Sequence, residues 1–270
     1  MNPLPDGLPA DPASLMAIAA EAATAAATMI RDARAAGFGI ETKSTDTDMV
    51  TDLDHASDRL IIEMLHSHRP DDAILTEESG MSAGTSGICW IVDPIDGTTN
   101  FVYDHPPYTV SIAAAVDGMP IAGVVLDISS GSTCSAALGR GATCDGAALR
   151  VRPAPPLHQA LVATGFAYSP ARRKQQAGVV LALIDRVRDI RRRGAASADL
   201  CSVARGSVDA YYEAGLGPWD LAAGRIIATE AGARVELLDD APTPLSVIAT
   251  HPDLFGPLLE LLLEVGADTI

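Results

Sequence analysis

Carboxylates at four places along the chain have the chemistry to bind divalent cations and to activate a water molecule. They are Asp54, the pair Glu77 and Glu78, the pair Asp93 and Asp96, and Asp220. Magnesium prefers oxygen ligands, usually a few carboxylates with water and substrate phosphate. Two such ions can clamp the attacking and leaving oxygens of a displacement at phosphorus, and one lowers the pKa of its bound water. These residue types therefore predict magnesium-dependent hydrolysis of a small phosphate monoester.

Residues 93–100 carry the local features that such a site needs. In a tight turn after a strand, Asp93 and Asp96 can face one cavity, and the carbonyl of Ile95 can point the same way. The intervening proline fixes one backbone angle, and Gly97 permits a sharp turn. The residues after this glycine can open a helix whose free N–H groups face an incoming phosphate.

Each of these signals has an ordinary explanation when it is taken alone. The Asp-Pro-x-Asp-Gly stretch is equally compatible with a turn, because each of those residues favours turns. A calcium loop of the EF-hand type fails on spacing, since Ile95 and Gly97 fall where side-chain oxygens are required. The glutamate pair alone is typical of a solvated surface, and Asp220 alone of a helix start. We base the catalytic prediction on their occurrence together.

The composition narrows the class of partner. The chain has 270 residues, 48% of them hydrophobic, which is enough for a sizeable core in one large domain or two intimate halves. Its 19 basic and 35 acidic residues give a net charge of −16. General nucleic-acid binding needs clustered Lys and Arg and is excluded. A phosphate ester near so many carboxylates is repelled unless metal ions invert the local field, which favours a metal site.

The cysteines and the N-terminus bear on the compartment. Cys89, Cys134, Cys144 and Cys201 are scattered, without a C-x-x-C pair, and we interpret them as buried or half-buried thiols in a reducing compartment. The chain does not open with a basic segment followed by an apolar run, and no long uninterrupted apolar stretch follows. We therefore expect a soluble, cytoplasmic protein without a membrane segment.

Sequence periodicity predicts an α/β fold in two halves. We expect a flexible tail over residues 1–12, an α+β half over 13–152 with most of the metal ligands, and an α/β half over 153–270. The expected helices are 12–36, 52–68, a short one from 98, 172–189, 197–205 with Ser197 as N-cap, 219–231 and 252–265. The expected strands are 73–75, 88–92, 109–116, 121–128, 133–138, 147–151, 161–165, 208–213, 233–237 and 245–250. Residues 40–48 are expected to form a loop.

These elements must bring the carboxylates together. The strand 73–75 runs into Glu77 and the strand 88–92 into Asp93, and ligands of sheet proteins gather at strand ends. Asp54 falls in the first turn of the helix 52–68.

Longer motifs around these carboxylates resemble the inositol monophosphatase family, in its bacterial form. The matching stretches are Thr76–Ser79, Trp90–Phe101 and Pro218–Gly224, and residues 43–54, 191–201 and 209–213 also fit. The resemblance runs from about Leu15 to Leu261, and three ordered motifs are far more specific than one. It implies a layered α-β-α-β-α sandwich of the sugar-phosphatase type.

The resemblance also implies a set of metal ligands. Glu77, Asp93 and the Ile95 carbonyl would hold one Mg²⁺, and Asp93, Asp96 and Asp220 a second. A third, weaker ion near Glu77 would give two or three per subunit.

Further roles follow from the resemblance. Asp54 and Thr98 would orient the nucleophilic water, with Asp54 as general base, and Glu78 joins them in the predicted catalytic set. Phosphate would meet the N–H groups of Gly97 and Thr98. The residues expected to contact substrate are Glu77, Ile95, Asp96, Gly97, Thr98, Arg191, Gly194, Ala195, Ala196, Glu213 and Asp220. Of the run Arg191–Arg193, Arg191 is the best placed for such a contact, although the run is equally compatible with a solvated or dimer-interface cluster.

The expected substrate is a small phosphorylated polyol, foremost myo-inositol monophosphate. Histidinol phosphate, fructose 1,6-bisphosphate and nucleotide 3′-phosphates remain alternatives on the same metal core, because Ala195 stands where the family usually has Ser or Thr. A regulatory binding partner with vestigial catalysis is an alternative of a different class. Lithium sensitivity and a homodimer are implied by the resemblance.

Overall fold

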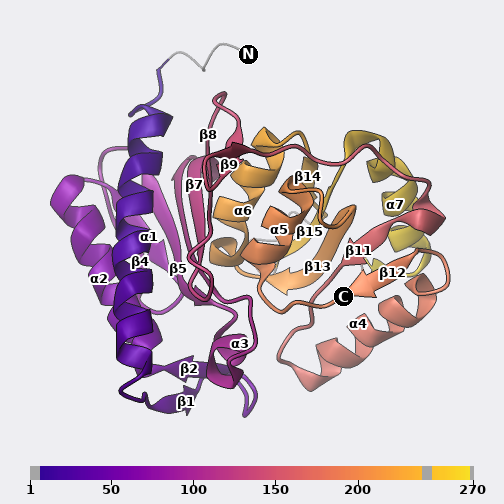
Figure 1. The fold of residues 1–270 in the computed structure, drawn as a ribbon, viewed down its shortest axis with the longest axis horizontal. Helices are drawn as coiled ribbons and strands as arrows, with labels where there is room; N and C mark the ends of the chain where they lie inside the picture. Colours follow the sequence, from indigo (N-terminus) through magenta and orange to yellow (C-terminus); the bar gives the residue numbers. More distant parts are fainter. Residues whose placement is uncertain (1–6, 239–244, 268–270) are drawn as a thin grey trace.

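The computed structural model describes residues 7–238 and 245–267, in five alternating layers (Figure 1). Helices α1 (Pro12–Arg34) and α2 (Asp52–His68) cover the outer face of an eight-stranded sheet. Helices α5 (Ala196–Ala204) and α6 (Pro218–Glu230) lie between this sheet and a five-stranded one, whose far face is covered by α4 (Pro170–Leu183) and α7 (Pro252–Glu264). The expected α-β-α-β-α sandwich is confirmed.

The two large sheets are built from separate stretches of chain. The strand order is β10-β9-β8-β7-β6-β5-β3-β4 in the first sheet and β12-β11-β13-β15-β14 in the second. The first comprises β3 (Ala73–Thr76), β4 (Gly80–Ser82), β5 (Cys89–Asp96), β6 (Thr109–Val116), β7 (Met119–Asp127), β8 (Thr133–Ala137), β9 (Ala142–Cys144) and β10 (Ala147–Ala148). The second comprises β11 (Leu161–Ala163), β12 (Asp189–Arg191), β13 (Ala210–Leu216), β14 (Arg234–Leu237) and β15 (Leu245–Thr250). The short helices α3 (Thr98–Tyr103) and η1 (Leu157–Gln159) complete the connections. The domain division at residue 152 stays a prediction, and residues 1–6 of the expected tail lie outside the described residues.

Local side-chain chemistry sets the starts of the two outer helices. Asp11 accepts a hydrogen bond from the backbone N–H of Ser14 at 3.2 Å, and proline follows it as the first residue of α1. At α2, the Thr51 hydroxyl accepts from the N–H of Asp54 at 3.3 Å, and the Asp54 carboxylate accepts from the N–H of Thr51 at 2.8 Å. This reciprocal capping fixes both the start of α2 and the position of Asp54.

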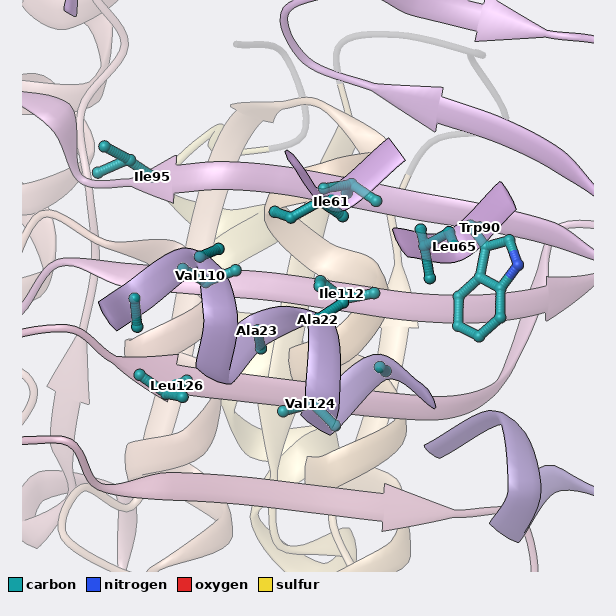
Figure 2. Packing of buried hydrophobic residues seen from close by; sticks show 14 of the residues in the cluster. Ala22, Ala23, Ile61, Leu65, Trp90, Ile95, Val110, Ile112, Val124 and Leu126 are labelled. Atoms are coloured by element: carbon teal, nitrogen blue, oxygen red, sulfur yellow. The ribbon is translucent and has the colours of Figure 1, made fainter. Parts of the chain in front are cut away.

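Alanine lets the outer helices approach the first sheet closely. Figure 2 shows Ala22 and Ala23 of α1 over the strands that carry Ile112 and Val124, in a cluster of fully buried side chains. Trp90 is the largest side chain of this cluster. Helix α1 is also the described helix that is long and apolar enough to cross a membrane. Its apolar face packs in the hydrophobic core.

The central helix α6 packs directly on the backbone of β7. A Cβ atom at Gly123 would lie 2.6 Å from Cγ2 of Ile226 and 2.9 Å from Cα of Ala223, so only glycine fits. On another side of α6, a Cβ at Gly224 would lie 2.6 Å from Cδ1 of Leu200 in α5. Helix α6 is therefore held by both neighbours, and this fixes its N-terminal turn.

Several sequence-based boundaries are wrong. Residues 40–48 are not entirely a loop, because β1 (Ile40–Thr42) pairs with β2 (Met49–Thr51). The exposed strand β1 has no buried face for a pattern to reveal. The expected helix 172–189 ends at Leu183, and β12 then pairs in parallel with β11. The expected strand 147–151 is only the two-residue β10.

Two residue-level expectations also fail. Cys134 and Cys144 face each other across β8 and β9 and form a disulfide, so the interpretation of all four cysteines as thiols is wrong for this pair. Spacing alone could not reveal that pairing. Ala195, not Ser197, is the N-cap of α5. The Ser197 hydroxyl instead bonds to a carboxylate of the other half.

Candidate active site

A cavity of about 340 Å³ is lined by residues of both large sheets and of the segments that follow their strands. The predicted site residues that line it are Glu77, Asp93, Ile95, Asp96, Gly97, Thr98, Gly194, Ala195, Ala196, Glu213 and Asp220. Residues 165–169, Arg172 and Arg192 also contribute to the lining. The lining therefore combines the end of β5 with segments that come more than sixty residues later in the chain.

Three carboxylates meet at one wall of the cavity. Asp93, Asp96 and Asp220 each offer an oxygen within 4.8 Å of the other two. Asp93 and Asp96 flank an irregularity in the pairing of β5 with β6, which turns both side chains toward the cavity. Asp220 lies in the first turn of α6, where it accepts a hydrogen bond from the N–H of Gly217 at 2.7 Å. Such a group of close oxygens is a ligand set for a hard divalent cation.

Burial and mutual repulsion perturb all three groups. Burial raises the pKa of Asp93 well above its ordinary value, and the charges of Glu77 and Asp96 raise it further. Burial and then the charge of Asp96 also raise the pKa of Asp220 well above its ordinary value. Burial raises the pKa of Asp96 to about 6, although hydrogen bonds from Ser197 oppose the shift. A bound cation would relieve this repulsion, so the residues fit a metal.

Lys43 forms ion pairs with the two glutamates that follow β3. Its Nζ lies 2.8 Å from Oε1 of Glu77 and also contacts Oε1 of Glu78. Burial raises the pKa of Glu77 and Lys43 opposes this, while the two glutamates raise the pKa of Lys43 despite its own burial. Glu78 is outside the lining of the cavity and its carboxylate contacts Lys43, and its catalytic role stays a prediction. Lys43 was part of a matching motif but was not predicted as a site residue.

Asp54 lies behind the cavity wall, fully buried. Its Oδ1 atom is 3.1 Å from the Thr98 hydroxyl, and its Oδ2 atom accepts two hydrogen bonds from Thr51. The Thr98 hydroxyl is also 3.1 Å from the carbonyl oxygen of Ile95, so its single proton is shared between two acceptors. Burial raises the pKa of Asp54. The structure thus joins Asp54 to Thr98, which does line the cavity.

The C-terminal half supplies the other walls. Glu213 accepts a hydrogen bond from the Tyr211 hydroxyl at 2.7 Å, and burial raises its pKa to about 7. Its carboxylate passes so close to Gly165 that a Cβ there would lie 2.1 Å from either oxygen. Ala195 brings its Cβ within 3.2 Å of the position that a Cβ on Gly97 would take. The backbone after β12 therefore lies directly against the turn that follows β5.

Arg191 is the arginine predicted to contact substrate, but the next residue, Arg192, is the one that lines the acidic cavity. Arg191 donates to Asp189 at 2.6 Å and lines a different cavity, of about 320 Å³. Arg192 lines the acidic cavity. Successive side chains of an extended backbone point to opposite sides, so the residue after the end of β12 turns inward. Arg172 was missed altogether, because an arginine in the first turn of an exposed helix carries no local signal.

Comparisons with known proteins agree with this geometry. The profile of the inositol monophosphatase family matches residues 11–260. The chain belongs to the inositol monophosphatase family. It is 44% identical over 246 residues, 84% of each chain, to the inositol-1-monophosphatase of Mycobacterium leprae. It is 44% identical over 195 residues, 72% of this chain and 73% of the other, to a protein of Pasteurella multocida named Nus factor SuhB.

The fold comparison points the same way. The structure of Mycobacterium tuberculosis SuhB superposes with a TM-score of 0.83 at 40% identity, over 95% of this chain and 98% of the other. As a member of the inositol monophosphatase family, the chain is an enzyme that hydrolyses phosphoric monoesters.

Proposed function

We propose that the protein hydrolyses the phosphate monoester of a small polyol, foremost myo-inositol monophosphate, to the free polyol and phosphate with Mg²⁺ as cofactor. The observation that supports this most directly is the meeting of Asp93, Asp96 and Asp220 within 4.8 Å at a cavity that also contains Glu213. The oxygens proposed to bind the metal and the carboxylate proposed to bind hydroxyl groups therefore line the same cavity.

The residues that would hold Mg²⁺ are those of the expected ligand sets. Glu77, Asp93 and the carbonyl of Ile95 form one set, and Asp93, Asp96 and Asp220 the other. Without a cation, burial and mutual repulsion raise the pKa of these carboxylates. Two or three ions per subunit would neutralise their charge. When bound, Mg²⁺ would neutralise the phosphate charge and lower the pKa of its bound water.

Asp54 and Thr98 would orient the nucleophilic water and accept its proton. Thr98 donates its hydroxyl proton to Asp54 across 3.1 Å, which leaves an oxygen lone pair free to accept a hydrogen bond from a water in the cavity. A proton leaving that water can pass through Thr98 to Asp54, whose raised pKa suits a general base. The N–H groups of Gly97 and Thr98 would orient the phosphate.

Glu213 and the backbone from Gly194 to Ala196 would receive the polyol. A half-buried carboxylate with one oxygen already bonded to Tyr211 retains acceptor sites for hydroxyl groups. Because the side chain at 195 is a methyl, the hydroxyl contacts there must come from backbone or from Glu213.

The direct test is phosphate release from myo-inositol 1-phosphate by the purified protein, with Mg²⁺ or with a chelator. We expect turnover that requires Mg²⁺ and exceeds that of histidinol phosphate and of a nucleotide 3′-phosphate. Faster release from histidinol phosphate would make the polyol assignment wrong, and no release from any ester would overturn the proposed function.

A second function, in which the chain serves as a regulatory partner, has one observation in its favour. The relative from Pasteurella multocida is named a Nus factor. Affinity purification from cells with the native protein and with Asp93→Asn separates the two. A partner captured equally by both forms would support a role that is independent of catalysis.

Assembly, inhibition and location complete the proposal. We propose a homodimer, inhibition by lithium and a cytoplasmic location, with no partner nucleic acid. Sedimentation gives the subunit number, and a lithium titration of the Mg²⁺-supported rate gives the inhibition. The oxidation state of Cys134 and Cys144 in freshly lysed cells reports the compartment, since reducing compartments open most disulfides.

A further inference from the structure

One cysteine of the disulfide lines a second cavity, of about 320 Å³, that shares no lining residue with the acidic one. Residues of β6, β7, β8, β11, β12 and α5 contribute to its walls. Cys134 is part of this lining, whereas Cys144 is not. Arg205 and Ser207 also line the second cavity and are exposed, so the cavity is open to solvent. A molecule that enters it meets the disulfide from the side of Cys134.

A single guanidinium group contacts both sulfur atoms of the disulfide. Nη2 of Arg205 lies 3.2 Å from Sγ of Cys134 and 2.6 Å from Sγ of Cys144, and it also donates to the Ser132 hydroxyl at 2.8 Å. Guanidinium is always charged, and a neighbouring cation stabilises a thiolate. Because the shorter contact is with Cys144, the geometry favours Cys144 as the sulfur that carries the negative charge when the disulfide opens.

The two remaining cysteines are poor candidates for opening this disulfide. Cys201 lines the second cavity, but burial raises its pKa to about 12, so it stays a protonated and weakly nucleophilic thiol. Cys89 is outside the lining, and burial raises its pKa as well. An attacking thiolate must therefore come from outside the chain. A cavity of about 320 Å³ is within the usual size range of small-molecule sites.

The charges of the lining favour an anionic visitor. Arg191, Arg193 and Arg205 line the second cavity, and Asp127 is the acidic residue of the lining. Arg191 shares its charge with Asp189 across 2.6 Å. The lining is still net positive, in a chain whose net charge is −16. Such a local reversal of charge attracts small anions into the cavity.

We propose that Cys134 is a site of thiol–disulfide exchange with a small thiol that carries carboxylate groups. The external thiolate attacks Sγ of Cys134 and forms a new S–S bond with it. The bond between Cys134 and Cys144 breaks, and its electron pair stays on Cys144 as a thiolate beside Arg205. One disulfide replaces another, so no further oxidant or reductant is needed. Attack of the Cys144 thiolate on Cys134 reverses the step and releases the small thiol.

This inference goes beyond the proposed function and does not depend on it. The test uses the native protein with its disulfide intact and two probe thiols, anionic glutathione and cationic cysteamine, at equal thiolate concentrations. Alkylation stops the reaction, and peptide mass spectrometry locates the adduct. We expect glutathione on Cys134 and the alkyl group on Cys144. Glutathione should react about 10-fold faster than cysteamine at low ionic strength, and salt should reduce this difference.

Substitutions separate the two roles of the arginines. Arg205→Gln should slow the exchange with both thiols about 10-fold, because Cys144 then leaves with a higher pKa. Arg193→Gln should reduce the advantage of glutathione over cysteamine about 3-fold, the scale of one partly screened charge. Lys174→Gln removes an exposed positive charge outside the second cavity and should change neither rate.

The native protein alone can overturn the proposal, so the test does not depend on the folding of a variant. Recovery of Cys134 and Cys144 as free thiols after air oxidation, or a glutathione adduct on Cys144 in place of Cys134, would refute it. Equal rates for the two thiols at low ionic strength would refute the choice of an anionic thiol. Phosphate release is measured separately, so its absence would bear on the proposed function and leave this exchange site standing.

Discussion

Ser197 donates its backbone N–H and its hydroxyl to the same carboxylate oxygen of Asp96, at 2.8 and 2.5 Å, across 101 positions of sequence. The N–H of Ala196 reaches the other oxygen at 3.2 Å. The first turn of α5 therefore holds the carboxylate that ends β5. A candidate metal ligand from the N-terminal half is oriented by the C-terminal half.

Removal of this hydroxyl should weaken metal binding without removing a ligand. In Ser197→Ala, Asp96 keeps both backbone hydrogen bonds but loses the side-chain hydrogen bond, which is the strongest of those that oppose its raised pKa, so a proton competes better with Mg²⁺. We expect the Mg²⁺ concentration for half-maximal activity to rise about 10-fold, the scale of lost support for a metal ligand, and more at pH 6.5 than at 8.5. Ser202→Ala, in the same helix but away from this cavity, is the control. An equal effect of both changes would refute the orienting role.

Loss of a cavity carboxylate should have opposite effects on activity and on metal-free stability. Asp93→Asn or Asp220→Asn should lower Mg²⁺-dependent phosphate release by at least about 100-fold. Each change also removes a charge that repels its neighbours, so the metal-free protein should melt a few degrees higher and gain little from added Mg²⁺. Thermal unfolding with and without Mg²⁺ measures this. A variant with full activity would refute the ligand sets.

The hydroxyl of Thr98 should matter more for turnover than for binding. Thr98→Val keeps the shape of the side chain but breaks the contact with Asp54, and we expect kcat to fall about 10²- to 10³-fold with a smaller change in KM. Thr98→Ser keeps the hydroxyl and should recover most of the rate. Steady-state kinetics of the two variants decides the point, since equal losses would indicate packing as the cause.

Glu213 should make the stability of the metal-free protein depend on pH. Burial raises its pKa from 4.5 to about 7, so the folded state binds the proton more tightly than the unfolded state. The resulting contribution is complete below pH 4.5 and is lost as pH rises through about 7. We expect the native protein to lose about 2–3 kcal/mol relative to Glu213→Gln between pH 5 and pH 8, measured by urea denaturation. Glu41→Gln, at an exposed position, should show no such difference.

The sequence predicts best where one face of an element is buried. The helix 52–68 has the predicted bounds because its apolar side packs in the core and Thr51 caps it. The carboxylates Asp93, Asp96 and Asp220 meet as predicted in space, because two lie beside one turn and the third begins a long helix. Their roles as ligands stay predictions.

The sequence predicts poorly where contacts come from distant segments. The exposed β1 and the short β12 exist only through their pairing partners. The disulfide of Cys134 depends on register, and the inward turn of Arg192 depends on where β12 ends. Arg172 reaches the cavity only because α4 is placed beside Gly215. None of these relationships is encoded within a short window of sequence.

The division of the cavity between two halves has a consequence for how new activities can arise. The close carboxylates are held by β5 and α6, whereas Arg172 lies in α4, which helps cover the outer face of the other sheet. We therefore expect substitutions in α4 and in residues 165–169, which line the cavity, to change which alcohol is accepted while the close carboxylates stay in place. Proteins of this fold can then change substrate through single substitutions and remain active at each one. A laboratory selection can proceed through the same substitutions.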